Sequence, residues 1–235
     1  MVTVSDLQRN PTVKNEINDK GHIFKNGNVT FGFLGYPVSQ AADITFLRAH
    51  VVPVGEDQKP MLEQTNEIIR KFHNYYGELF PRPQGIYGEV GRLLGLDGRK
   101  MSKSFNNAIY LSDSLEDISK KVKTAQTDSD TINLIVFDEK RKQNVANLIK
   151  YYQIATGKSI EEIEKEFQGL TSYKQFKERL VLVLDNFLSP IRARRAEYEK
   201  NPDLVWGILF EGTARVKKEA EKTMNLVKEK MKILY

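Results

Sequence analysis

Two lysines and two serines lie close together in the turn-rich stretch GLDGRKMSKSFNNAIYLSD, at Lys100, Ser102, Lys103 and Ser104. Two ammonium groups on one loop can contact two oxygens of a polyphosphate, and serine hydroxyls and loop N–H groups add neutral donors. A leaving pyrophosphate gains charge as its bond breaks, so cations that tighten their contact at that moment are catalytic. A lone K-x-x-K is usually a solvated loop. The full pentapeptide is far more specific and predicts a site for nucleotide phosphates.

The stretch before this loop has the pattern of an α/β unit. HVVPVG is a short β-branched run that ends in glycine, which is typical of a buried strand. Apolar residues then recur at helical spacing over 60–76, and Gly77 is placed to end that helix. The turn between strand and helix carries Gly55, Asp57 and Gln58. It lies at the carboxyl end of the strand, where open α/β sheets bind ligands, although Asp57 could equally cap the helix.

The chain after Asp113 has a different character, because helices follow one another and glycine becomes rarer. Ser114 is placed to cap one helix, and Ser159 and Glu162 form a capping box for another. Pro190 and Pro202 are each placed to begin a further helix. The sequence therefore predicts an α/β part followed by an all-helical part.

Composition narrows the classes of protein without choosing one. The 235 residues include no cysteine, which excludes disulfides and thiolate metal sites and fits the reducing cytoplasm. His22, His50 and His73 are scattered and lack metal-ligand spacing. No run reaches the roughly 18–20 apolar residues of a membrane helix. The net charge of +5 is compatible with a polyanion partner but does not identify one.

Three stretches together resemble the tryptophanyl-tRNA synthetases, a family of class I aminoacyl-tRNA synthetases. GYPVSQAADI, VVPVGEDQKPMLEQTNEIIRKF and GLDGRKMSKSFNNAIYLSD occur in that family's order and spacing, and the pentapeptide matches its KMSKS signature. The similarity covers the chain from Leu7 to Asp113. It implies a partial Rossmann-like nucleotide-binding sheet over residues 1–112 and an all-helical, anticodon-binding domain over 113–235. It also implies a cytoplasmic homodimer that uses ATP with Mg²⁺, tryptophan and tRNA(Trp).

The resemblance assigns roles at the nucleotide. Lys100, Ser102 and Lys103 would act on the ATP phosphates during catalysis, and the loop backbone at Met101 would lie near adenine. The metal would bind the phosphates, with no ligand from protein side chains. The implied ATP-binding residues are Gly55, Asp57, Gln58, Lys100, Met101, Ser102 and Lys103.

The resemblance also assigns the tryptophan contacts. A helix predicted to begin near Pro37 carries Asp43, which matches the carboxylate that accepts the indole N–H. Indole is only a donor, so a buried acceptor would discriminate against phenylalanine. Tyr36 matches a tyrosine that reaches the α-ammonium group, and Gln58 matches a residue near the amino acid. Gln40 departs from the pattern, because better-known bacterial members carry methionine there.

A basic cluster in the helical part, IRARRAEYEK, offers Arg192, Arg194 and Arg195 as tRNA contacts. The alternative is a solvated helix face with salt bridges to the glutamates that follow. Trp206 is expected to pack inside the helical domain.

One signature of class I synthetases is missing from the 235 residues, the His-x-Gly-His/Asn turn of the first strand–helix junction. The chain therefore resembles the C-terminal portion of a synthetase, and we expect it to be inactive alone. Two alternatives stay open. Tyrosyl-tRNA synthetases share the fold and a Y-P…Q…D helix, but they typically have glycine before G-x-D-Q, where this chain has VPVGEDQ. The second alternative is a non-catalytic module that binds tRNA or protein.

Overall fold

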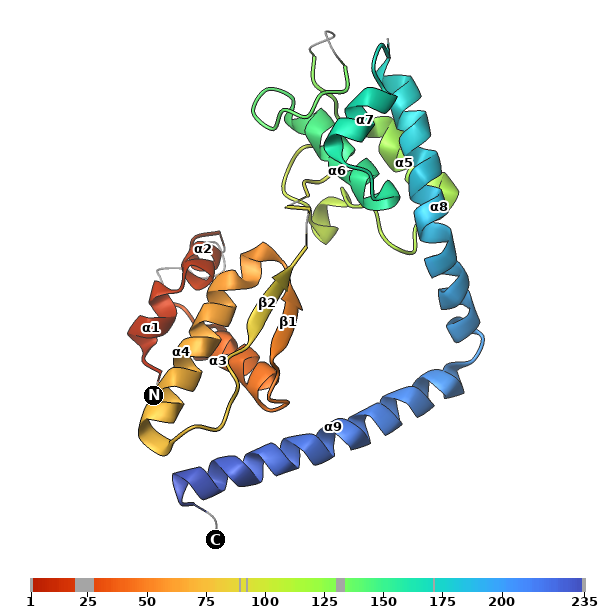
Figure 1. Ribbon diagram of the computed structural model, residues 1–235. Helices are drawn as coiled ribbons and strands as arrows, with labels where there is room; N and C mark the ends of the chain where they lie inside the picture. Colours follow the sequence, from red (N-terminus) through yellow and green to blue (C-terminus); the bar gives the residue numbers. More distant parts are fainter. Residues whose placement is uncertain are drawn as a thin grey trace. The chain divides into compact units, whose positions relative to one another are not determined.

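The computed structural model describes residues 2–19, 28–88, 90–91, 93–129, 134–170 and 172–233. The chain forms two compact units (Figure 1), one from Met1–Glu89 with Trp206–Tyr235 and one from Val90–Val205. Each unit is described by itself below. The predicted domain division at residues 112–113 stays a prediction.

The first unit is built around a β-α-β segment. β1 (Val51–Val54) and β2 (Gln84–Tyr87) pair in parallel, with Val51 opposite Gln84, and α4 (Lys59–Tyr76) connects them. α3 (Phe31–Thr45) packs against α4. The remaining elements of this unit are α1 (Val4–Arg9), α2 (Pro11–Asp19), the 3-10 turn η2 (Glu56–Gln58) and most of α9 (Pro202–Met231).

The predicted strand, turn and helix are all present. Gly77 ends α4 with φ +88°, a conformation that glycine adopts without strain. Two details differ from the prediction. β1 alternates between exposed and half-buried residues, and Val51 keeps 50% of its surface, because β2 is its only partner strand among the described residues. α3 begins at Phe31 rather than near Pro37, because the hydroxyl of Thr30 accepts a hydrogen bond from the Phe33 N–H and caps the helix there.

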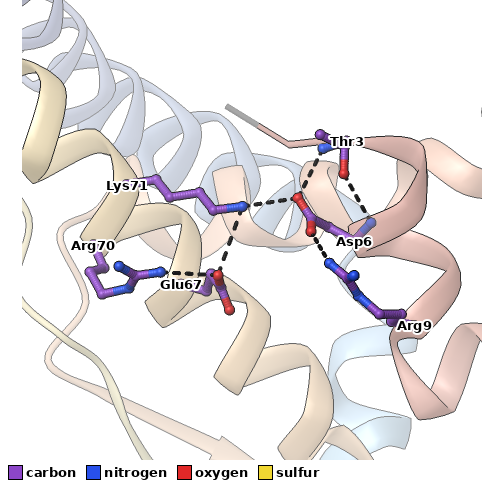
Figure 2. Close-up of polar contacts among 6 residues, drawn as sticks. All are labelled: Thr3, Asp6, Arg9, Glu67, Arg70 and Lys71. Atoms are coloured by element: carbon purple, nitrogen blue, oxygen red, sulfur yellow. Dashed lines mark hydrogen bonds and ion pairs between the residues drawn. The ribbon is translucent and has the colours of Figure 1, made fainter.

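A polar network ties α1 to α4 (Figure 2). The carboxylate of Asp6 accepts hydrogen bonds from Lys71 Nζ at 2.9 Å, from Arg9 Nη2 at 2.6 Å and from the Thr3 N–H at 3.1 Å. Lys71 also lies 3.8 Å from Glu67. These contacts lower the pKa of Asp6 well below its usual value, chiefly through the hydrogen bond from Lys71.

The second unit is helical. It contains the 3-10 turn η3 (Lys103–Phe105), α5 (Leu115–Thr124), α6 (Gln143–Thr156), α7 (Ile160–Glu166) and α8 (Tyr173–Glu199). α8 packs against both α5 and α6, and the core between them includes Ile118, Ile149 and Leu180, none of which keeps more than 1% of its surface. The mixed fold, with a small parallel sheet and a helical part, confirms the predicted fold class.

Both predicted helix caps of this unit are confirmed. The Ser114 hydroxyl accepts from the Asp117 N–H at 3.1 Å, and the Ser159 hydroxyl accepts from the Glu162 N–H at 3.3 Å.

Pro190 does not begin a helix as predicted, because it lies inside α8. Proline cannot donate to the carbonyl four residues earlier. That carbonyl, of Asn186, instead accepts a hydrogen bond from the Ser189 hydroxyl at 3.4 Å.

The prediction of a packed Trp206 is wrong. Its side chain keeps 57% of its surface and stacks on Phe210, one turn further along α9, with ring centroids 5.9 Å apart.

None of the helices in the described ranges is both long and apolar enough to cross a membrane.

Candidate active site

The lysine-rich loop has a defined backbone shape. Leu94 forms an isolated antiparallel bridge with Lys100, and the Gly95 N–H donates to the Arg99 carbonyl at 2.8 Å. Gly98 closes this turn with φ +74°, which favours glycine. The loop closes at its base, where the Leu96 N–H donates to the Asn107 carbonyl at 2.8 Å.

The helical unit anchors the base of the loop. The side chain of Asn147, on α6, accepts from the Leu94 N–H at 2.8 Å and donates to the Leu94 carbonyl at 3.1 Å. Tyr151, also on α6, donates to the same carbonyl at 3.1 Å, and burial raises its pKa to about 12. Leu96 lies in the hydrophobic core, and Met101 packs against it. The loop is therefore fixed to α6 at one end, while its polar tip faces solvent.

The groups predicted to contact phosphates lie at that tip. The side chains of Lys100 and Lys103 are exposed, and Lys103 begins the turn η3. Within the described ranges, the Lys103 ammonium has no hydrogen-bond or ion-pair partner. The hydroxyls of Ser102 and Ser104 lie 2.8 Å apart. The guanidinium of Arg99 is already engaged by other side chains of the loop. It pairs with Asp97 at 2.7 Å and lies 4.6 Å from the centroid of the Phe105 ring.

The first unit gathers the predicted amino-acid contacts. Tyr36, Gln40 and Asp43 lie four and three residues apart on α3, which places them along one side of the helix. The Gln40 side chain donates to Oε1 of Gln58 at 3.1 Å, and Gln58 donates to Oδ2 of Asp57 at 3.0 Å. One hydrogen-bonded chain therefore connects α3 to the turn after β1, which begins at exposed Gly55.

Tyr36 has a feature typical of a ligand contact. Its phenol oxygen is buried and has no hydrogen-bond partner in the part of the chain that the structure describes. Its ring packs edge-on against Phe33, with centroids 5.5 Å apart. Burial, with a smaller contribution from Glu16, raises the pKa of Tyr36, so the phenol stays neutral at physiological pH. A buried phenol oxygen of this kind can accept a hydrogen bond from a bound ammonium group.

Asp43 differs from the expectation of a buried acceptor, because its side chain is exposed. It lies one turn beyond Gln40, toward the end of α3, where the helix gives way to the turn at Phe46. Its role toward indole stays a prediction.

The three arginines of α8 are not equivalent. Arg192 is half-buried; its Nη1 donates to the Asp113 carbonyl at 3.1 Å, and its Nη2 pairs with Asp185. Arg195 pairs with Glu199 at 2.7 Å. Arg194 is exposed and makes no ion pair with any residue that the structure describes. The alternative of a salt bridge to a following glutamate therefore fits Arg195. Arg192 instead pairs with a preceding aspartate, and a contact of any of the three arginines with RNA stays a prediction.

Sequence reasoning missed two polar contacts in these sites. The bond from Gln40 to Gln58 joins residues 18 apart, and Gln40 was singled out only as a departure from a family pattern. The buried side chain of Asn107 organises the lysine-rich loop from outside the pentapeptide. The only sequence signal for it was an asparagine pair after the pentapeptide, a composition common in turns.

Comparisons with known proteins show the family to which the chain belongs. The family model of class I tRNA synthetases (W and Y) matches residues 1–189, and the chain belongs to that family. A tryptophan–tRNA ligase from Lactococcus lactis subsp. lactis is 43% identical over 247 residues, which cover 100% of this chain and 70% of the relative.

Two solved structures are also similar. Tryptophanyl-tRNA synthetase from Mycoplasma pneumoniae matches with a TM-score of 0.81 at 26% identity, over 98% of this chain and 70% of that one. The enzyme from Campylobacter jejuni, complexed with ADP and tryptophan, matches with a TM-score of 0.70 at 28% identity, over 96% of this chain and 68% of that one.

Proposed function

We propose that this chain serves in a tryptophan–tRNA ligase, which joins tryptophan to ATP as tryptophanyl-adenylate and then transfers it to the 3′ end of tRNA(Trp). The observation that carries the proposal is the 43% identity to a tryptophan–tRNA ligase along the whole chain. Two further features support it: the exposed Lys100 and Lys103 of the lysine-rich loop, called the phosphate loop from here on, and the buried phenol oxygen of Tyr36. The lysines are suited to ATP, and the phenol is suited to the amino acid.

In the proposed first step, a tryptophan carboxylate oxygen attacks the α-phosphate of ATP, and the bond to the leaving pyrophosphate breaks. No protein nucleophile is required, so catalysis consists of positioning and charge stabilisation. Lys100 and Lys103 would neutralise the pyrophosphate as its charge grows, with Ser102 and the loop N–H groups as further donors. Mg²⁺ would arrive on the ATP phosphates. Met101 would contribute backbone contacts near adenine.

We propose that the first unit binds the amino acid and the nucleoside. Asp43 would accept the indole N–H, and Tyr36 would accept a hydrogen bond from the α-ammonium group. Gln58 would lie beside the amino acid, at the end of a turn that contacts the ribose through Gly55 and Asp57. The bond from Gln40 fixes the side chain of Gln58 and so supports this arrangement.

The proposal extends to partners and location. The helical domain would receive the tRNA anticodon, with Arg194 as the most accessible of the three predicted arginines. The functional enzyme would be a homodimer in the cytoplasm. Tyrosine is the competing amino acid, and the names of the curated relatives favour tryptophan over it.

Pyrophosphate exchange tests the reaction. The 235-residue chain would be assayed alone and together with a polypeptide that supplies the His-x-Gly-His/Asn turn, using tryptophan, tyrosine and phenylalanine in turn. We expect exchange that depends on tryptophan in the supplemented assay and none with the chain alone. Exchange with tyrosine instead would move the assignment to the tyrosyl enzyme. Binding of tRNA(Trp) with no exchange under any condition would favour the non-catalytic module.

A further inference from the structure

A single buried side chain holds the phosphate loop in shape. Asn107 keeps 6% of its surface. Its Oδ1 accepts a hydrogen bond from the Ser102 N–H at 2.9 Å. Its Nδ2 donates to the Lys100 carbonyl at 3.1 Å and to Oδ1 of Asp97 at 2.8 Å. Asn107 therefore contacts the backbone on both sides of Met101, the second residue of the pentapeptide.

The chemistry of these contacts requires an amide. The NH₂ group of Asn107 faces two acceptors, the Lys100 carbonyl and Asp97 Oδ1, and its oxygen faces one donor, the Ser102 N–H. If the amide were flipped, its oxygen would face the two acceptors and no hydrogen bond could form there. A leucine could fill the space but would leave the Ser102 N–H without this partner. An aspartate would keep the acceptor and lose both donors. The bond from Asn107 is also the main reason that the pKa of Asp97 lies below its usual value.

The surrounding backbone makes room for this side chain. A Cβ atom on Gly95 would lie 2.1 Å from Nδ2 of Asn107, so only glycine fits at that position without displacing the amide. Asn106, the preceding residue, is exposed and adopts the left-handed conformation with φ +49°, which asparagine tolerates better than most residues. The two adjacent asparagines thus differ in role: Asn106 adopts the backbone conformation of the turn, and the Asn107 side chain forms hydrogen bonds inside the loop.

We propose that Asn107 is a positioning residue for adenylation: it fixes the backbone from Lys100 to Ser102, so that the lysine ammonium groups and the Ser102 hydroxyl approach the phosphates from a preorganised loop. This inference rests on the proposed function and adds to it a residue outside the pentapeptide. Preorganisation matters because groups that need not rearrange during the reaction stabilise its transition state best.

The first test measures the loop itself and needs no activity. Amide hydrogen exchange at Ser102 would be followed by NMR in the 235-residue chain and its variants. Asn107→Ala removes the acceptor of the Ser102 N–H, so we expect exchange at least about 10-fold faster, equivalent to about 1.4 kcal/mol of lost protection. Gly95→Ala should have the same effect by displacing the amide. Asn106→Gly, which keeps the left-handed backbone conformation without strain, is the matched control and should leave Ser102 protection unchanged.

The second test measures catalysis in the supplemented exchange assay. Asn107→Ala should lower kcat and raise the KM for ATP while leaving the KM for tryptophan unchanged, whereas general misfolding would affect all three. Asn107→Asp places a second carboxylate beside Asp97, so its rate relative to wild type should rise as the pH falls and one proton bridges the pair. Asp97→Asn should partly rescue Asn107→Asp, because an amide then donates to the introduced carboxylate.

The outcomes separate this inference from the proposed function. A wild-type protein that shows no tryptophan-dependent exchange in the supplemented assay would refute the proposed function and, with it, the role in adenylation. A wild-type protein that is active, together with an Asn107→Ala variant that keeps its rate and its Ser102 protection, would overturn the role of Asn107 alone. Faster amide exchange with an unchanged rate would also overturn it, because the fixed loop would then not matter to the reaction.

Discussion

Gln40 on α3 donates a hydrogen bond to Gln58, in the turn after β1, with Nε2 and Oε1 3.1 Å apart. Gln58 in turn donates a hydrogen bond from Nε2 to Oδ2 of Asp57 at 3.0 Å. Methionine, which the family resemblance expects in place of Gln40, could not make this bond as a donor. The polar residue at this position therefore has a partner inside the first unit, and it need not signal a different amino-acid substrate.

The bond can be measured with a double-mutant cycle of Gln40→Met, Gln58→Met and the double variant. A neutral, partly buried hydrogen bond contributes about 0.5–1.5 kcal/mol, so we expect a coupling free energy of that size in urea unfolding. Ser39→Ala, on the exposed position beside Gln40, is the control and should not couple to Gln58. A coupling near zero would show that the bond contributes nothing to stability.

Lys103→Ala should lower the adenylation rate much more than it weakens tryptophan binding. Its exposed ammonium is placed to act on phosphates, and loss of one preorganised charge costs about 3–4 kcal/mol, or roughly 10²–10³ in rate. Pyrophosphate exchange in the supplemented assay gives the rate, and the KM for tryptophan gives the comparison. Lys120→Ala removes another exposed lysine of the same unit, which pairs with Glu116, and should change neither. A decrease below threefold for Lys103→Ala would show that the loop does not act in catalysis.

Asp43 should determine the choice of amino acid. Asp43→Ala removes a charge-assisted acceptor that contributes about 1.5–3 kcal/mol, so the KM for tryptophan should rise roughly 10- to 100-fold. Discrimination against phenylalanine should weaken, and the KM for ATP should stay nearly constant. Asp43→Asn keeps one acceptor oxygen, and its effect should be smaller. If both variants discriminate as the wild type does, Asp43 does not read the indole and the tryptophan assignment loses its main residue.

Local patterns could be predicted from the sequence because their interactions are local. The capping boxes at Ser114 and Ser159 join groups three residues apart, and Gly77 needed only its own backbone conformation. Proline signals gave mixed results, because Pro202 begins α9 as predicted whereas Pro190 lies inside α8. Pro190 was predicted to begin a helix, but a hydroxyl one residue earlier compensates the hydrogen bond that it removes.

Contacts between distant residues could not be predicted in this way. The guanidinium of Arg192 reaches the carbonyl of Asp113 across 79 positions, and the sequence alone presented it as one of three equal cations. The roles of the motif residues at the candidate site stay predictions, and the exposure of each side chain depends on packing that the sequence does not show. The side chain of Asp43 is exposed, whereas the phenol oxygen of Tyr36 is buried, and the periodicity of α3 does not distinguish them.

The contact between Asp6 and Lys71 predicts a pH dependence (Figure 2). Because folding lowers the pKa of Asp6, its stabilising contribution is fully present above the unfolded pKa, near 3.8, and is lost as the pH falls toward the folded value. Lys71→Gln removes the main cause of the lowered pKa. We therefore expect the variant to lose less stability than the wild type when urea unfolding is compared at neutral pH and below pH 4. Arg70→Gln, which removes a neighbouring cation that pairs with Glu67, should behave like the wild type.

Arg194 and Arg192 should respond differently to replacement by alanine. A cation that contacts one phosphate contributes about 0.9 to the slope of log K against log salt concentration. Arg194→Ala should therefore weaken tRNA(Trp) binding and reduce that slope by about one, without changing stability. Arg192→Ala should instead lower the urea midpoint, because it leaves Asp185 without its cation and the Asp113 carbonyl without a donor.

Filter binding of tRNA(Trp) over a salt series, with urea unfolding of the same samples, separates the two roles. Arg195→Ala, which breaks only an exposed pair with Glu199, is the control for removal of a positive charge from α8. A general effect of net charge would weaken binding equally in all three variants, whereas a specific contact at Arg194 would give the largest change there. The contrary result would be that Arg192→Ala keeps its stability and is alone in reducing the salt slope. In that case the side of α8 that carries Arg192 would face the RNA. The contacts of Arg192 with Asp113 and Asp185 would then have to break when RNA binds.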